Sequence, residues 1–365
     1  MDREVSTNQI ITRKKILING SIFLGLILLT FYVLFRDNNI NDVINVMLSV
    51  DEKYVLISIL CMCVFVSCEA INIGRSLKLF QYKIGFFTRL KYALVGFFFS
   101  AVTPSASGGQ PMQLYFMHKD RIKIGHSTLA LLMDLASYQF ITVFMAVIGL
   151  ITNYGLLDES LGKIKYLLII GVILNTLALA IILIAIFSKR LMRKLIDLGT
   201  FLLTKFKYKK VNTLREKAIT VAKEYENSAV YFRENKLTIV KILITTLIQL
   251  STLNSIPFWI YKSFGLSGYS IGSVIALQSV LFITVSALPL PGAVGVSESG
   301  FMIMFRTLFP TQIISAAMLL SRGISFYLCT LISGLIILVV YVFTMKRKIY
   351  QEEVGEKMGG KRIEL

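Results

Sequence analysis

The sequence has little charge and few of the residues that usually carry catalysis. Only 16% of its 365 residues are charged, whereas soluble domains carry about a quarter. It contains four cysteines, two histidines and one tryptophan. No nucleophile–base pair, metal-ligand set, Walker loop or dinucleotide fingerprint occurs, so we expect no catalytic residue, no metal and no cofactor. With 55% hydrophobic residues and a mean hydropathy of +0.70, the chain is predicted to be a polytopic membrane protein.

The charge that is present is strongly basic, with 39 Lys and Arg against 21 Asp and Glu. These residues lie between apolar segments, as expected for loops that face an anionic cytoplasmic leaflet. Nucleic-acid binding can use the same net charge of +18, but no nucleic-acid motif accompanies it. We therefore expect a membrane surface, and no nucleic acid, as the partner of the basic loops.

Several apolar runs are long enough to cross a bilayer, since about 20 helical residues span the roughly 30 Å hydrocarbon core. Basic residues precede the first run and follow the last one at 346–348, so both termini are expected in the cytoplasm. The six expected full transmembrane helices are 16–35, 54–74, 126–151, 166–187, 237–260 and a last helix that ends near Thr344.

Two further apolar segments, 92–117 and 271–309, are interrupted by proline and glycine. Both contain Pro-x-Ala-x-Gly, at 104–108 and at 291–295. Proline lacks an amide proton and the backbone of glycine is too flexible, so neither segment can continue as a helix through its centre. Broken backbone at membrane depth is tolerated only where protein or a water-filled cavity satisfies the freed peptide groups.

The basic loops predict how these interrupted segments sit. A full crossing by 92–117 would place the insert 188–236, with 13 basic against 5 acidic residues, on the outside. That would violate the positive-inside rule, whereas a hairpin entering from the cytoplasm keeps the insert inside. The same argument makes 271–309 an outer hairpin, although Ile271 to Ala287 is almost long enough to span.

The expected fold is therefore all-α, with about six full transmembrane helices and two oppositely oriented re-entrant hairpins. Residues 16–151 and 166–345 form an inverted-topology repeat in one integral membrane domain, 1–365. Paired broken segments in two halves of a membrane protein are typical of transporter binding sites. The basic insert 188–236 reads as two amphipathic pieces, which either lie on the membrane surface or form a solvated cytoplasmic elbow.

Ionisable residues within the apolar runs mark candidate site positions, because a carboxylate at the membrane centre costs about 2.5–3.5 kcal/mol. Asp134 lies 30 residues after Pro104, and Arg322 lies 31 residues after Pro291. The repeat thus puts opposite charges at equivalent places. We expect Arg322 to neutralise Asp134, Glu298 or a lipid phosphate, and the alternative is that it reaches the outer surface.

Each chain reversal would expose backbone N–H groups and a helix N-terminus, which together suit a phosphate or carboxylate. We expect the returning arms to begin at Pro111 and at a capping Ser297. The alternative is that both breaks are only tight packing corners. The predicted substrate-binding residues are Thr103, Pro104, Gly108, Gly109, Gln110, Asp134, Pro291, Gly292, Gly295, Glu298 and Arg322.

Three stretches, 103–111, 290–298 and 321–322, are similar to motifs of one membrane family. They read Thr-Pro followed by Gly-Gly-Gln-Pro, then Leu-Pro-Gly-x-x-Gly-Val-x-Glu, and finally Ser-Arg. These motifs resemble the lysylphosphatidylglycerol synthase transmembrane-region family, the flippase-like half of the multiple peptide resistance factor. The resemblance covers about residues 15–345, and family members often carry Glu where Gln110 stands here.

The resemblance implies a membrane protein that binds a phospholipid or lipid-linked head group and moves it between leaflets. Lysylphosphatidylglycerol or another anionic or aminoacylated lipid is the expected cargo. The full-length synthase has a soluble lysine-transfer domain, whereas only about twenty residues follow the last helix here, so we expect no transferase activity from this chain alone.

Two alternatives stay open. One is a membrane component of phosphatidylglycerol lysyltransferase, acting with a separately encoded aminoacyl transferase in lipid modification and cationic peptide resistance. The other is a small-solute secondary transporter. In every case we expect a multi-pass protein of a bacterial cell membrane, with membrane phospholipid as its partner.

Overall fold

The structure is a computed structural model that describes residues 40–156, 165–187, 234–286 and 288–340. Within these residues the chain forms helices joined by short turns, with no strand. The expected first helix, 16–35, and nearly all of the insert 188–236 lie outside the described residues.

Five helices in the described part are long and apolar enough to cross a membrane. They correspond to five of the six expected crossings. The first of them extends beyond its expected end at residue 74, so Arg75 and Lys78 lie on its last turns and not in a loop. The five are α3 (Glu52–Leu79), α6 (Ile124–Thr152), α8 (Lys165–Phe187), α11 (Lys236–Ser263) and the helix Ile314–Val340, which contains α14 (Ile314–Arg322) and the π-helical turn η6 (Gly323–Leu328).

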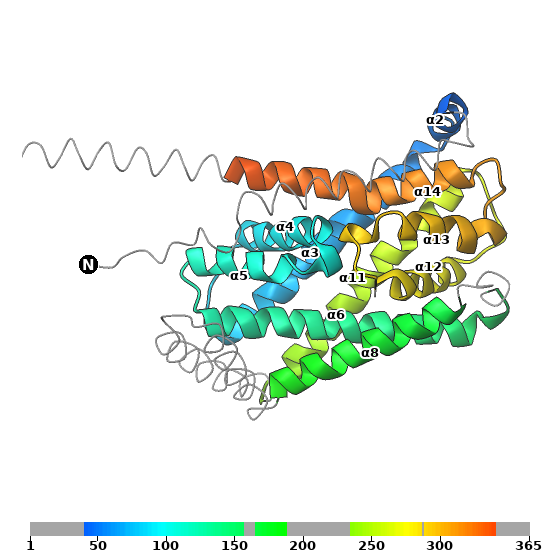
Figure 1. The fold of residues 1–365 in the computed structure, drawn as a ribbon. Coiled ribbons are helices and arrows are strands. Elements are labelled where there is room, and N and C mark those ends of the chain that lie inside the picture. The colour runs from blue at the N-terminus through cyan, green and yellow to red at the C-terminus, as the bar shows by residue number, and fades with distance from the viewer. Residues whose placement is uncertain (1–39, 157–164, 188–233, 287, 341–365) are drawn as a thin grey trace, which may run out of the picture.

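Two pairs of shorter helices lie among these long ones. Helix α4 (Phe86–Ala101) packs against α5 (Gly109–Lys119), and α12 (Ile271–Ser286) packs against α13 (Val296–Met304). Figure 1 shows that the α4–α5 pair opens toward one end of the molecule and the α12–α13 pair toward the other. Short elements complete the described fold, namely α2 (Ile40–Leu48) and the 3-10 turns η2 (Pro104–Ala106), η4 (Pro291–Ala293) and η5 (Phe305–Thr307).

The hairpin boundaries differ from those expected from the sequence. The first arm, α4, begins at Phe86 and not at residue 92, so its 16 residues extend about 24 Å. The returning arm α5 begins at Gly109, which places Pro111 at the third position of the first turn. Its missing N–H still has no cost there, because the first N–H groups of a helix lack intrahelical partners. The cap of α13 is Gly295, so the expected cap at Ser297 is wrong.

The turns η2 and η4 at the hairpin tips have the same backbone conformation. The residue after each proline has a positive φ, 51° at Ser105 and 59° at Gly292, and the next residue does too, 52° at Ala106 and 50° at Ala293. In each turn the N–H of that alanine donates to the carbonyl before the proline, at 3.2 and 3.1 Å. Because positive φ is strained for residues other than glycine, this match goes beyond the similarity of the two sequences. The two turns also contact each other.

Small residues let helix α12 approach its neighbours closely. A Cβ atom on Gly171 of α8 would lie 2.5 Å from the Ile283 carbonyl oxygen, and one on Gly149 of α6 would lie 3.1 Å from the Ala276 Cα atom. Helices in membranes associate through such contacts, because lipid is as apolar as the side chains it would replace. Helix α12 is thereby held against both α6 and α8.

The polar face of α11 forms interhelical hydrogen bonds. The Asn72 amide of α3 donates to the Thr246 hydroxyl at 3.0 Å, and the Asn254 amide donates to Ser279 of α12 at 2.9 Å. Arg75 donates to the Thr245 hydroxyl. These contacts fix α3 and α12 against α11, which crosses the centre of the fold (Figure 1).

The close contact at Gly171 predicts a local loss of stability. Gly171→Ala should lower the free energy of unfolding by about 1–3 kcal/mol, because the added methyl meets backbone that cannot rotate away. The measurement is the thermal unfolding midpoint in detergent. Gly272→Ala is the matched control, since its new Cβ would meet only the Ser270 hydroxyl oxygen at 3.7 Å. Equal midpoints for the two variants would contradict the close packing of α8 on α12.

Candidate functional site

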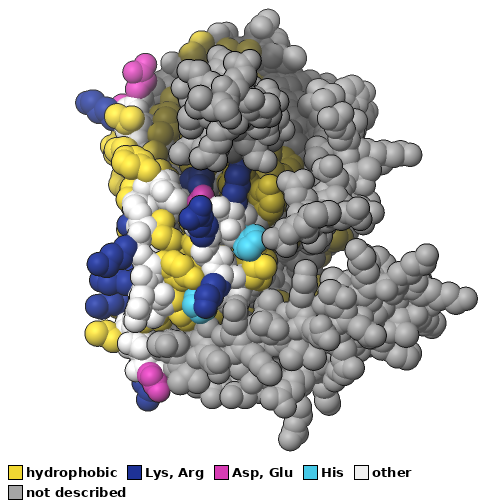
Figure 2. All heavy atoms as spheres, turned by 90° about the vertical axis from the view of Figure 1, so that its left-hand side faces the viewer, with side chains coloured by type: hydrophobic (Ala, Val, Ile, Leu, Met, Phe, Trp, Pro, Cys, Tyr) yellow, Lys and Arg dark blue, Asp and Glu magenta, His cyan; other side chains and the backbone are white. Residues whose placement is uncertain are grey.

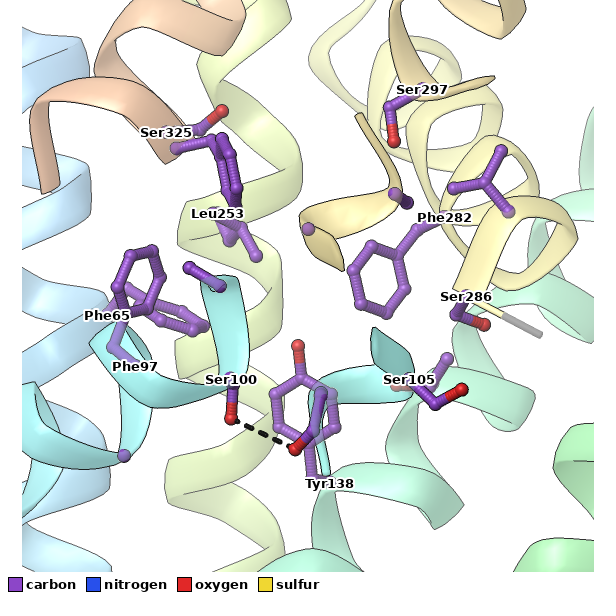
Figure 3. Close-up of a pocket in the computed structure, with 18 of the residues that line it drawn as sticks. Phe65, Phe97, Ser100, Ser105, Tyr138, Leu253, Phe282, Ser286, Ser297 and Ser325 are labelled. Carbon is purple, nitrogen blue, oxygen red and sulfur yellow. Dashed lines mark hydrogen bonds between the residues drawn. The ribbon is translucent and has the colours of Figure 1, made fainter. Parts of the chain in front are cut away.

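A cavity of about 520 Å³ lies where the two hairpin tips meet. Its wall includes residues of both turns, of α3, α6, α11 and α12, and of the last helix. Figure 3 shows side chains from these elements converging on it, including Tyr138, Phe282 and Ser325. The volume is within the range of ligand sites, roughly 300–1,000 Å³. Its charged and amide side chains are Glu69, Gln110, Gln113, Asp134, Gln139, Asn175, Gln278 and Arg322.

On the side of the second hairpin, Arg322 and Glu298 form an ion pair. The Arg322 Nε atom donates to Glu298 Oε1 at 2.8 Å, and its Nη2 atom donates to the Gly292 carbonyl at 3.1 Å. The Tyr327 hydroxyl donates to the same carboxyl oxygen at 2.9 Å. Three alternative partners were expected for Arg322, and the one it contacts in the structure is Glu298. The alternative that Arg322 reaches the outer surface is wrong, because its side chain is only 17% exposed.

Glu298 also occupies the N-terminus of α13. Its Oε2 atom accepts the N–H of Gly295 at 2.7 Å. A helix N-terminus favours negative charge, and here the protein supplies that charge itself. Arg322 still lines the cavity, with its guanidinium carbon 4.4 Å from the centre of the Phe326 ring. Helix α14 thus presents a cation to the cavity whose charge is already balanced by Glu298 of the second hairpin.

On the side of the first hairpin, two carboxyl groups line the cavity, those of Glu69 and Asp134. The Gln113 amide donates to Glu69 Oε1 at 2.9 Å. The two acidic groups also interact electrostatically with each other, and Asn72 lies against Asp134. Within the described residues neither has an ion-pair partner. The expected pairing of Arg322 with Asp134 is therefore absent there.

Of the eleven predicted binding residues, the four that line the cavity are Gln110, Asp134, Gly292 and Arg322. The other seven do not line it. They are Thr103, Pro104, Gly108, Gly109, Pro291, Gly295 and Glu298.

Thr103 and the two glycines of the first break hold the hairpin tip together. The Thr103 hydroxyl donates to the Phe99 carbonyl at 2.5 Å and accepts the Gly108 N–H at 2.8 Å. A Cβ atom on Gly109 would lie 2.1 Å from the Ser100 hydroxyl oxygen and 2.9 Å from the Gly96 carbonyl. Gly109 is therefore needed for the close approach of α5 to α4.

Many polar residues of the wall were not predicted as binding residues, including Glu69, Gln113, Tyr138, Asn175 and Gln278. Glu69 is one of the few ionisable residues in an apolar run, so the sequence does contain a signal for it. The others carry no motif. The polar residues of α11 do not line the cavity, since α11 contributes only Leu253, Ile256 and Pro257 to the wall.

Comparisons with known proteins also indicate a membrane protein. The family model described as the lysylphosphatidylglycerol synthase TM region matches residues 16–333. A UPF0104 membrane protein of Archaeoglobus fulgidus is 26% identical over 261 residues, which cover 67% of this chain and 74% of that protein. A UPF0104 membrane protein of Methanocaldococcus jannaschii is 25% identical over 346 residues, or 90% of this chain and 96% of that protein. Together with the five apolar helices, the match supports a multi-pass membrane protein.

The ion pair at the second hairpin predicts a stability hierarchy among variants. Arg322→Leu should destabilise the protein by about 3–5 kcal/mol, because it leaves the Glu298 carboxylate, 3% exposed, without its partner. Adding Glu298→Gln to that variant should restore part of the loss, since the stranded charge is then removed. Thermal unfolding midpoints in detergent measure both. A double variant no more stable than Arg322→Leu would contradict the pairing.

Proposed function

We propose that this chain, which belongs to the lysylphosphatidylglycerol synthase transmembrane-region family, binds a phospholipid or lipid-linked head group and moves it between the leaflets of a membrane. The observation that carries the proposal is the cavity between the two hairpin tips. It combines charged side chains with the polar backbone of two broken segments, and broken segments that meet inside a membrane are where transporters bind their cargo.

The inverted-topology repeat is part of the proposal, and three features support it. The turns η2 and η4 share their backbone conformation and contact each other. The hairpins open toward opposite ends of the molecule (Figure 1). The helix contacts also pair off. In the first half, α3 packs on α4 and α6, and in the second half its counterpart α11 packs on α12 and α14. The two counterparts, α3 and α11, also pack on each other. A two-fold relation between the halves produces this pattern.

One end of the described helices is suited to gathering anionic lipid. Figure 2 shows Lys and Arg side chains spread over the end where the α4–α5 hairpin opens. Each such residue near a membrane surface attracts anionic lipid by about 1 kcal/mol. We assign this end to the cytoplasmic face, with the first hairpin re-entrant from that side and the second from the other. Basic residues near this end are Lys78, Lys83, Arg89, Lys91, Lys119, Arg121 and Lys123.

The wall of the cavity suits a head group with both polar and apolar parts. Arg322 and the amide of Gln110 line the cavity together with aromatic side chains, among them Phe65, Phe97 and Phe282. Phosphatidylglycerol and its lysyl form are the first cargoes to test, because their net charges have opposite signs. A separately encoded aminoacyl transferase would then supply or use the cargo without taking part in its movement.

The proposal is tested by reconstituting the full chain in liposomes with labelled phosphatidylglycerol or lysylphosphatidylglycerol. We expect leaflet exchange of at least one of them that depends on the head group and exceeds that of protein-free vesicles. No head-group-dependent exchange of any lipid would contradict lipid movement. Uptake of a small solute under the same conditions would instead favour the secondary-transporter alternative.

A variant of the cavity wall should separate binding from folding. Gln110→Leu should slow exchange about tenfold or more, a loss of about 1.4 kcal/mol in head-group binding. Met112→Leu, two residues along α5 and outside the wall, is the matched control and should exchange normally. Gly109→Leu would not serve, because its side chain would collide with α4. Equal rates for the Gln110 and Met112 variants, at equal abundance, would contradict the assignment of the cavity.

A further inference from the structure

The charges around the cavity do not balance. Within the described residues, the titratable side chains that line it are Glu69, Asp134, Tyr138 and Arg322. Arg322 is already neutralised by Glu298. Two carboxyl groups are therefore left in the membrane interior without a counter-charge, and each ionised carboxylate there costs several kcal/mol unless something compensates it.

Each of these carboxyl groups has an amide side chain beside it. The Gln113 amide nitrogen donates to Glu69 and also to the Tyr92 carbonyl, at 2.9 and 3.2 Å, so its orientation is fixed as a donor. The Asn72 side chain lies against Asp134. Burial in the membrane interior opposes a charge on either group, and a bound cation would offset that cost. Two carboxyl groups that face one cavity are therefore a place for a cation.

A second observation points to the same ligand. The Thr142 hydroxyl is buried, with the residue only 4% exposed, and it lines the cavity without a hydrogen-bond partner in the described structure. The Oε1 atom of Gln278, on the facing helix α12, also lacks a partner there. An unpaired polar atom in a protein interior costs about 1–3 kcal/mol. Such atoms are expected where an ion or a water passes.

Three of the groups that line the cavity lie in a row along one face of α6. Asp134, Tyr138 and Thr142 follow one another at intervals of four residues, so they share one face of the helix and span about 12 Å. All three line the cavity. The row leads from Asp134 toward Gly149, which closely approaches Ala276 of α12, two residues before Gln278.

We propose that Glu69 and Asp134 bind a monovalent metal cation, Na⁺ or K⁺, which reaches them along the face of α6 that carries Tyr138 and Thr142. Oxygen ligands suit hard cations. Calcium takes six to eight oxygens, including several carboxylates, and no group of three His, Cys, Asp or Glu side chains suited to a metal occurs in the part of the chain described. The inference deepens the proposed function by supplying an ion that can drive it, and to that extent it rests on that function.

Binding of the ion is measured on the purified full chain in detergent, without lipid cargo, using radioactive Na⁺ with K⁺ or N-methylglucamine as competitor. We expect saturable binding that N-methylglucamine does not displace. Glu69→Gln and Asp134→Asn should each weaken it about tenfold or more. Glu52→Gln, an exposed carboxylate in the first turn of the same helix α3, is the control and should bind as the unchanged protein does.

The route is tested by a change that keeps the shape of the side chain. Thr142→Val should slow the exchange of bound Na⁺ about threefold to tenfold and leave its equilibrium affinity unchanged, because the hydroxyl lies on the route about 12 Å from Asp134 along α6. Thr152→Val is the control, because its hydroxyl already donates to the Ile148 carbonyl of its own helix at 2.8 Å. Effects of equal size in the two variants would contradict the route.

Absence of saturable Na⁺ and K⁺ binding, or binding that survives both carboxyl substitutions in folded protein, would overturn the proposal. That outcome leaves lipid movement intact, since the assay contains no lipid cargo. Conversely, Na⁺ binding in a protein that exchanges no lipid would retain the ion site and remove the proposed function. In active liposomes, an imposed Na⁺ or K⁺ gradient should change the rate of lipid exchange in the direction of the gradient.

Discussion

A helix that is interrupted inside a membrane exposes N–H and C=O groups that lipid cannot satisfy, and this constraint shapes the centre of the protein. Both interruptions satisfy part of this requirement internally. In the first, the Thr103 hydroxyl bridges the Phe99 carbonyl and the Gly108 N–H. In the second, Glu298 accepts the N–H of Gly295, and Arg322 donates to the Gly292 carbonyl. At the second break, Arg322 therefore both stabilises the backbone and lines the cavity.

The two breaks solve the same problem in chemically different ways. The first uses a neutral hydroxyl, and the acidic groups nearby, Glu69 and Asp134, are left facing the cavity. The second uses an ion pair that is nearly buried, with side-chain exposures of 17% and 4% for Arg322 and Glu298. A backbone that is similar in both halves thus carries an asymmetric charge distribution. This asymmetry lets one cavity offer a balanced cation on one side and two carboxyl groups on the other.

Much of the fold could be predicted from the sequence, because it is determined by features of short segments of the chain. Apolar length predicts α3, α6, α8 and α11, and the proline and glycine residues predict the breaks at Pro104 and Pro291. The site was harder to predict, because contacts between distant residues decide it. Nothing in the sequence distinguishes Glu298 from Asp134 as the partner of Arg322. Gly109 reads equally well as a ligand contact and as a packing residue, and only the proximity of the Gly96 carbonyl decides for packing.

The central claim is that the two hairpins enter the membrane from opposite sides and meet within it. Single cysteines placed in the loops 120–123 and 265–269, in a chain whose four native cysteines have been replaced, test this most directly. A membrane-impermeant maleimide should modify 265–269 from outside intact cells, and 120–123 only after the membrane is opened. Modification of both loops from the same side would contradict the mirrored arrangement, and with it the cavity formed by the two tips.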